Sequence, residues 1–222
     1  MEMTNILNEA IIKELIDENI NTYRNSKSRI ISDFRGEKGF TAAYNGRQLL
    51  ELLQNADDAQ TDKVLISIDT ENNILSIANN GMSFDAEGLR SLMLANISSK
   101  NKREFIGNKG LGFRSILNWV ISVKVKTQDF ILEFSPKIAK REFEKIILST
   151  EEQQQIISNE KDLSQGEIPF AILAIPDFTK NTIEQEFTTI IELNYKEKRG
   201  TTYFKPVRNN YTRSSIVSKS YL

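Results

Sequence analysis

The chain has 222 residues, of which 39% are hydrophobic and 27% are charged, and its formal net charge is -1. These values are ordinary for a globular protein, and the balanced charge gives no overall indication of a nucleic acid or a membrane surface as partner. Because the sequence has no cysteine and no histidine, it excludes disulfides, thiol nucleophiles, zinc sites built from these residues and imidazole bases. It contains no apolar run of bilayer length and no signal peptide, so we expect a cytoplasmic protein.

The N-terminal part predicts one helix and a connector. Residues 8–21 carry Ile11, Ile12, Leu15 and Ile16 at helical spacing. Residues 23–38 are polar and are followed by glycine, which favours a connector over an element of the core. We therefore assign residues 1–38 to an N-terminal helix and connector, and residues 39–195 to the main domain.

A second helix, predicted at residues 41–60, carries an unusual polar face. Glu51, Asn55 and Asp58 are spaced i, i+4, i+7 and share one side of the helix. The opposing side is apolar and comprises Leu49, Leu52, Leu53 and Ala56. Short acidic and amide groups can hold a hard cation and a water molecule. The alternative is an ordinary helix with a solvated polar face.

The remaining segments alternate between strands and helices. We predict strands, which form two hairpins and complete one sheet, at residues 63–70, 74–79, 121–127, 130–134, 169–175 and 187–193. We predict short helices at residues 85–95 and 111–119, and an insertion at residues 135–166 with a helix at 151–158. Runs of strands with helices between them, but few βαβ units, favour an α+β fold of two layers.

A glycine-rich turn precedes the helix predicted at residues 111–119. Gly107, Gly110 and Gly112 would let the backbone approach an anion closely, and a helix N-terminus favours negative charge. The order GxxGxG differs from the dinucleotide-binding GxGxxG, and no Lys-Ser/Thr pair follows as in a Walker A loop. The alternative is a tight turn before a helix.

Three stretches in this order resemble the N, G1 and G2 boxes of the GHKL (Bergerat-fold) ATPase superfamily. They are RQLLELLQNADDAQ at residues 47–60, SIANNGMSF at 76–84 and IGNKGLGFRS at 106–115. The superfamily includes gyrase, the large heat-shock chaperones, histidine kinases and mismatch-repair ATPases. The motif sequences found here resemble most those of the sacsin-like ATP-binding domains. The resemblance covers residues 39–193. It implies a two-layer α/β sandwich with a mixed, largely antiparallel sheet and helices on one face.

The resemblance also implies roles for individual residues. Asn55 corresponds to the Mg²⁺ ligand, Glu51 to the general base and Asp58 to a residue that supports the pocket. Asn79 stands where the family usually has the aspartate that binds adenine, and Thr189 corresponds to the threonine behind it. Ser83 stands where a second glycine is common. The other residues expected at the nucleotide are Gly81, Met82, Lys100, Gly107, Lys109, Gly110, Leu111, Gly112 and Phe113.

These roles predict an Mg²⁺-dependent ATP-binding domain with slow ATPase activity that acts as a conformational switch for a partner protein. The alternatives are a nucleotide sensor that does not hydrolyse ATP and an interaction scaffold that binds no nucleotide. In relatives the lid, here residues 94–106, closes together with dimerisation through the N-terminal segment. Residues 8–21 would accordingly serve an ATP-dependent homodimer or cap their own core.

The last segment, residues 196–222, is basic and contains interspersed aromatic residues. Its basic residues are Lys196, Lys198, Arg199, Lys205, Arg208, Arg213 and Lys219, and its aromatic residues include Tyr203, Phe204 and Tyr211. Such a tail can follow nucleic-acid phosphates and stack on bases. The alternative is a solvated or partner-binding tail.

Overall fold

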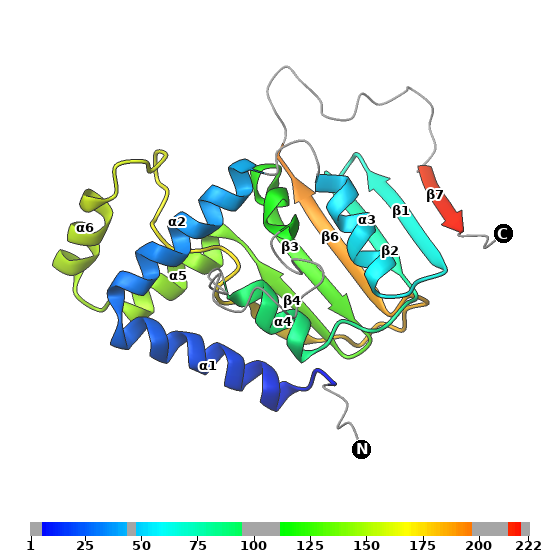
Figure 1. Ribbon diagram of the computed structural model, residues 1–222, viewed down its shortest axis with the longest axis horizontal. Helices are drawn as coiled ribbons and strands as arrows, with labels where there is room; N and C mark the ends of the chain where they lie inside the picture. The colour runs from blue at the N-terminus through cyan, green and yellow to red at the C-terminus, as the bar shows by residue number, and fades with distance from the viewer. Residues whose placement is uncertain (1–5, 44–47, 95–111, 197–212, 219–222) are drawn as a thin grey trace, which may run out of the picture.

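The computed structural model describes residues 6–43, 48–94, 112–196 and 213–218. Its helices are α1 (Glu9–Asn25), α2 (Lys27–Ala43), α3 (Gln48–Asp58), α4 (Ala86–Met93), the 3₁₀ helix η2 (Gly112–Asn118), α5 (Pro136–Ile146) and α6 (Thr150–Asn159) (Figure 1). Its strands are β1 (Lys63–Asp69), β2 (Ile74–Asn79), β3 (Val120–Thr127), β4 (Phe130–Phe134), β5 (Asp177–Lys180), β6 (Thr189–Tyr195) and β7 (Arg213–Ser218).

The described strands form one open seven-stranded sheet in the order β5-β4-β3-β6-β2-β1-β7. The two predicted hairpins, β1–β2 and β3–β4, are confirmed, and β6 lies between them. Every described strand pair is antiparallel, so the parallel component of the expected mixed sheet is not found among these strands. The α+β class is confirmed, and the architecture is consistent with two layers.

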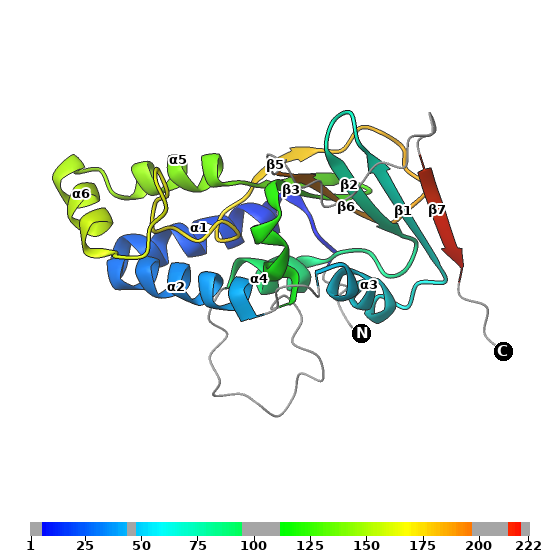
Figure 2. The same cartoon turned by 90° about the horizontal axis from the view of Figure 1, so that it is seen from above.

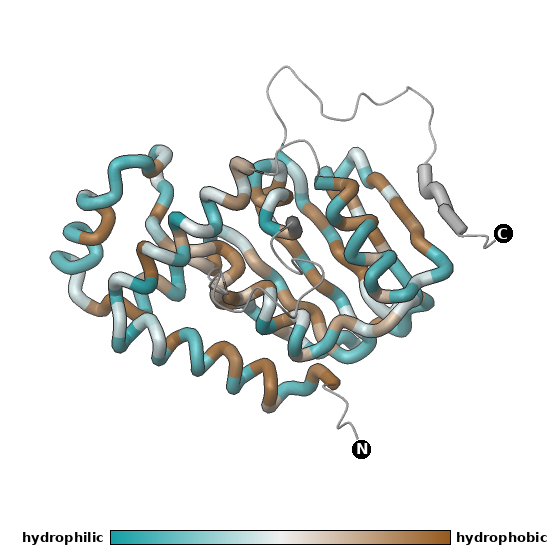
Figure 3. The backbone as a smooth tube through the Cα atoms, in the orientation of Figure 1, coloured by the Kyte–Doolittle hydropathy of each residue, from teal (hydrophilic) through white to brown (hydrophobic). Residues whose placement is uncertain are grey.

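The helices α3, α4 and η2 lie on one side of the sheet (Figure 2). The main core fills the space between this layer and the strands and includes Leu52 of α3, Leu89 of α4 and Ile77 of β2. Hydrophobic residues recur along the strands and along α1 in Figure 3. Leu7, Ile12 and Leu15 of the N-terminal segment belong to the same core, so α1 packs against its own chain. Among the described residues, no helix is both long and apolar enough to cross a membrane.

The prediction of a connector at residues 23–38 is wrong, because α2 occupies most of that range. Its buried side includes the apolar residues Ile30 and Phe34 but also Asp33 and Glu37. These acids stand at helical spacing where hydrophobic residues would be expected, so the apolar period that signals a helix is interrupted. The predicted helix at 41–60 is correspondingly two helices, since residues 41–43 end α2 and α3 begins at Gln48.

The strand predicted at residues 169–175 is also wrong. The segment is buried but irregular, and the next strand, β5, begins at Asp177. The Glu37 carboxylate accepts hydrogen bonds from the backbone N–H groups of Ile172 (2.6 Å) and Leu173 (3.1 Å). A buried side chain therefore satisfies backbone donors that a neighbouring strand would satisfy in a sheet.

The insertion at residues 135–166 contains two helices, and only α6 was predicted. α5 begins with Ser135, whose hydroxyl accepts from the N–H of Ile138, and with Pro136 in its first turn. It buries Ile138, Phe143 and Ile146 on one side. The Ser-Pro start followed by this spacing is a helix signal that the sequence does contain. The helix predicted at 111–119 is instead the tighter 3₁₀ helix η2.

Candidate functional site

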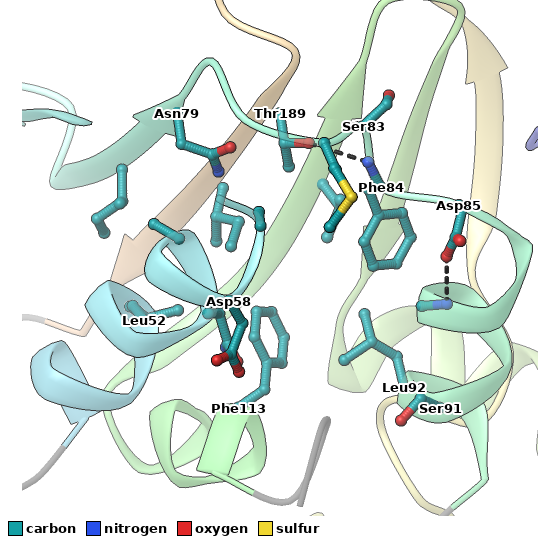
Figure 4. Close-up of a pocket in the computed structure, with 18 residues that line it drawn as sticks. Leu52, Asp58, Asn79, Ser83, Phe84, Asp85, Ser91, Leu92, Phe113 and Thr189 are labelled. Carbon is teal, nitrogen blue, oxygen red and sulfur yellow. Dashed lines mark hydrogen bonds between the residues drawn. The ribbon is translucent and has the colours of Figure 1, made fainter. Parts of the chain in front are cut away.

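A pocket of about 210 Å³ lies between α3, the ends of β2 and β6, α4 and η2 (Figure 4). Its lining includes six of the residues that the resemblance assigned to a nucleotide, from four separate stretches of sequence. They are Asn55, Asp58, Asn79, Met82, Phe113 and Thr189. The volume is below the range of about 300–1,000 Å³ that is common for small-molecule sites. The described residues would therefore enclose only part of a nucleotide.

Most of the pocket wall is apolar. The cavity is lined by Leu52 and Ala56 of α3, by Ile77 of β2 and by Ile191 of β6, with further apolar surface from Phe84, Leu92, Phe113 and Val125. These side chains also belong to the buried core or are packed against it. A flat aromatic ring would fit between such walls and would remove apolar surface from water.

The two polar residues at the end of the pocket come from neighbouring strands. Asn79 ends β2 and Thr189 begins β6, and the two are direct partners in the antiparallel ladder. Each is 5% exposed, and Figure 4 shows their side chains at the same end of the pocket. Both belong to the buried face of their strands, together with Ile77 and Ile191. Residues 110 positions apart in the sequence thereby form one polar end of an apolar pocket.

The loop after β2 is held against the C-terminal end of α3. The N–H of Met82 donates to the carbonyl oxygen of Ala59 (2.7 Å), which directly follows α3. At Gly81, a Cβ atom would collide with that same carbonyl oxygen. The close approach explains why glycine occupies position 81: any larger residue would push the loop away from α3.

Side chains on both flanks fix the same loop. The Asn80 Oδ1 accepts from the Thr61 hydroxyl (2.7 Å) and from the N–H of Lys63 (3.0 Å), while its Nδ2 donates to Asp62 (2.6 Å). The Thr188 hydroxyl lies 2.8 Å from the carbonyl oxygen of Gly81 and 3.1 Å from that of Asn79. Asn80 was not among the predicted site residues; it does not line the pocket but joins the loop to the segment between α3 and β1.

The predicted acidic face of α3 is only partly in contact with the pocket. Asn55 and Asp58 line it, whereas Glu51 lies one helical turn towards the helix N-terminus and is half-buried outside the described lining. Asp85, the other carboxylate in the lining, caps α4 by accepting from the N–H of Gly88 (2.8 Å). No lysine or arginine is among the described lining residues, so phosphate charge would have to be compensated elsewhere.

Several predicted residues lie outside the described part of the chain. They are Lys100, Gly107, Lys109, Gly110 and Leu111, together with most of the lid predicted at residues 94–106. Gly112 is the first residue of η2, and Phe113 brings this helix into the pocket. Residues 197–212 of the basic tail are likewise outside, and residues 213–218 form β7 at the edge of the sheet beside β1.

The sequence did not predict the role of Arg114, which is 1% exposed. Its guanidinium donates to the carbonyl oxygen of Leu92 at the end of α4 (2.8 Å), and its own carbonyl oxygen accepts from Thr41 of α2 (3.1 Å). Burial lowers the pKa of Arg114, and the nearby carboxylates of Glu37 and Asp33 oppose that shift. Arg114 therefore joins η2 to α2 and α4 behind the pocket.

A second cavity, of about 470 Å³, lies between α2, η2 and α5. None of the predicted site residues lines it. Its side chains include the ion pair of Lys38 with Glu167 (3.0 Å), which crosses from α2 to the loop after α6. Although this cavity is larger, the pocket beside α3 brings together the predicted residues.

The residues of the smaller pocket fit a purine nucleotide in part. Apolar walls, two buried polar groups and an amide next to a carboxylate on α3 are present. The described residues contain no cluster of three or more aspartate or glutamate side chains able to hold a metal by themselves. A magnesium ion bound through Asn55 needs no such cluster, since Mg²⁺ commonly keeps several waters and uses substrate phosphates as ligands. Comparison with models of known protein families, and with curated proteins, finds no match to this chain.

Proposed function

We propose that this protein is an Mg²⁺-dependent ATP-binding domain of the GHKL (Bergerat-fold) type, with slow ATPase activity that serves a conformational switch. One observation carries the proposal: Asn55, Asp58, Asn79, Met82, Phe113 and Thr189 line one pocket although they are dispersed over 135 positions of the sequence. The motif resemblance selected these residues independently of the fold.

The chemistry of the lining favours this function. A purine ring would lie between the apolar side chains of α3 and those of β2 and β6, with its polar edge towards Asn79 and Thr189. The phosphates would then extend past α3 towards the residues that precede η2. The amide oxygen of Asn55 would hold magnesium, which when bound neutralises phosphate charge and orients the terminal phosphate.

Glu51 is the residue we assign to hydrolysis. It lies one helical turn from Asn55 on the same helix, so both face the region where the phosphates would extend. Its carboxylate would orient the attacking water and accept its proton, since the chain has no histidine to do so. Without an active Glu51, the domain would bind nucleotide as a sensor and would not hydrolyse it.

Two substitutions on α3 separate binding from hydrolysis. Glu51→Ala should bind ATP with magnesium as tightly as the parent but lose hydrolysis by about 10²–10⁴-fold, the usual contribution of a general base. Asn55→Ala should lose the magnesium-dependent part of binding. Binding is measured by displacement of a fluorescent nucleotide and hydrolysis by phosphate release.

Gln54→Ala is the matched control, because Gln54 is on the same helix but exposed. It should change neither quantity. Full turnover in Glu51→Ala would contradict the assignment of the base and leave binding intact. Unchanged magnesium dependence of ATP binding in Asn55→Ala would contradict the assignment of Asn55 as the magnesium ligand. Failure of ATP to bind the parent would support the scaffold alternative.

A further inference from the structure

The two buried polar side chains at the end of the pocket both have their acceptor atoms engaged. The Oδ1 of Asn79 accepts from the N–H of Gly81 (3.3 Å), and the Oγ1 of Thr189 accepts from the N–H of Phe84 (3.1 Å). Both donors belong to the loop that follows β2. The dashed line in Figure 4 marks the bond to Thr189.

The first of these bonds fixes the orientation of the Asn79 amide. A backbone N–H can pair only with the amide oxygen, and a flipped amide would set two donors against each other. The Nδ2 group of Asn79 is therefore the part left for the cavity. Within the described part of the chain, Nδ2 has no hydrogen-bond partner, and neither does the hydroxyl proton of Thr189.

The end of the pocket thus presents two donors, next to Ser83, in a wall that is mostly apolar. Both side chains are only 5% exposed and line the cavity, so a ligand that offers acceptors to these donors would form hydrogen bonds shielded from bulk water. At C6, guanine and hypoxanthine carry an oxygen, which is an acceptor, whereas adenine carries an amino group, which is a donor. The remaining lone pair of Thr189 Oγ1 can still accept a hydrogen bond from that amino group. Adenine would therefore still bind, but less favourably.

We infer that the pocket takes 6-oxopurine nucleotides, GTP and ITP, as well as ATP, and that Asn79 is the residue that sets this choice. The inference rests on the proposed function, because it concerns the base of a nucleotide bound at the same site. A carboxylate at position 79 would reverse the preference between 6-oxopurines and adenine. Its second oxygen would only accept, so it would favour the adenine amino group and oppose an oxygen at C6.

The test is competition of ATP, GTP and ITP against a fluorescent nucleotide in the presence of magnesium. In the parent, GTP should bind within about tenfold of ATP or more tightly, and ITP should match GTP because the two share the oxygen at C6. Asn79→Asp should shift the GTP:ATP affinity ratio towards ATP by at least about tenfold, as expected for replacing a satisfied buried hydrogen bond by a repulsive pair.

Asn194→Asp is the matched control. It makes the same change on β6, but on the opposite face of the sheet from Thr189, and should leave the ratio unaltered. Asn79→Leu, which is close in size and removes the Nδ2 donor without adding a charge, should also shift the ratio towards ATP. It provides an independent variant if Asn79→Asp proves unstable by thermal unfolding.

The outcomes separate the two proposals. ATP bound with more than tenfold preference over GTP, or a ratio unchanged in both site variants, overturns this inference and leaves ATP binding in place. A shift of equal size in Asn194→Asp overturns the assignment to Asn79, because the effect would then be one of charge alone. Failure of every nucleotide to bind the parent overturns both this inference and the proposed function.

Discussion

At the scale of single residues, the sequence anticipated which side chains would meet but not how they are held. Asn79 and Thr189 were assigned by resemblance, and strand pairing makes them direct neighbours. The bonds that orient them come from backbone N–H groups of Gly81 and Phe84, which no side-chain motif encodes. Spacing along a helix was sufficient for Asn55 and Asp58 because the helical period alone places them together.

Gly81 offers a test of the contact between the loop and α3. Gly81→Ala would set a methyl group against the Ala59 carbonyl oxygen, which is backbone and cannot move aside alone. We expect a loss of about 1–3 kcal/mol in the free energy of unfolding, as for other overpacked sites. Urea unfolding measures the difference, and weaker nucleotide binding should accompany it.

Gly39→Ala is its matched control. Gly39 lies within α2, where an added Cβ would meet nothing within 4 Å. Alanine is favoured over glycine in a helix interior, so this variant should be more stable by about 0.5–1 kcal/mol. Equal stabilities of the two alanine variants would show that the contact of Gly81 with Ala59 does not constrain the loop.

At the scale of secondary-structure elements, prediction succeeded where a regular apolar period is present. β2 and β4 have the predicted bounds, and α1 begins directly after Asn8, the first residue of the predicted helix, whose side chain caps it. It failed where polar groups enter the core. α2 buries two acids, and the irregular segment at 169–176 relies on one of them for its backbone hydrogen bonds. Glu37 contributes to both errors, because it is one of the buried acids of α2 and joins α2 to the irregular segment.

Glu37 makes the junction of these elements sensitive to pH. Burial raises its pKa above the ordinary value of 4.5, opposed by the N–H groups of Ile172 and Leu173 and by the charge of Arg114, while Asp33 raises it further. A folded-state pKa above the unfolded value means that the folded protein binds the proton more tightly. Its contribution to stability is therefore complete below about pH 4.5 and is lost as the pH rises through the folded pKa.

Glu37→Gln removes the titrating carboxylate, so comparison of this variant with the parent should reveal the contribution of Glu37 to stability. The free energy of unfolding of the variant, relative to the parent, should increase as the pH is raised from about 4.5 through the folded pKa. Denaturant unfolding of both proteins over this range provides the measurement, with near-ultraviolet circular dichroism to verify that the variant keeps its packing. A difference that is constant with pH, or that falls, would contradict the direction assigned to Glu37.

At the scale of the whole molecule, the order of the strands decides where the pocket lies. β6 lies between the β1–β2 hairpin and the β3–β4 hairpin. This position brings Thr189 beside Asn79 and Ile191 beside Ile77. Periodicity predicted β1 to β4, β6 and the α+β class but neither β5 nor β7. The register of β6 on β2 depends on pairs of residues more than 100 positions apart in the sequence. The walls contributed by Phe84, in the loop before α4, and by Leu92 of α4 were likewise missed, because an apolar side chain does not reveal which cavity it will line.

The central claim is that this pocket binds ATP with magnesium. Isothermal titration calorimetry with ATP and with a non-hydrolysable analogue, each in the presence of magnesium and after its removal by a chelator, tests it most directly. We predict one nucleotide bound per chain, similar affinity for ATP and the analogue, and weaker binding without magnesium. Absence of binding heat for both nucleotides over a range of temperatures would contradict the claim and favour an interaction scaffold that binds no nucleotide.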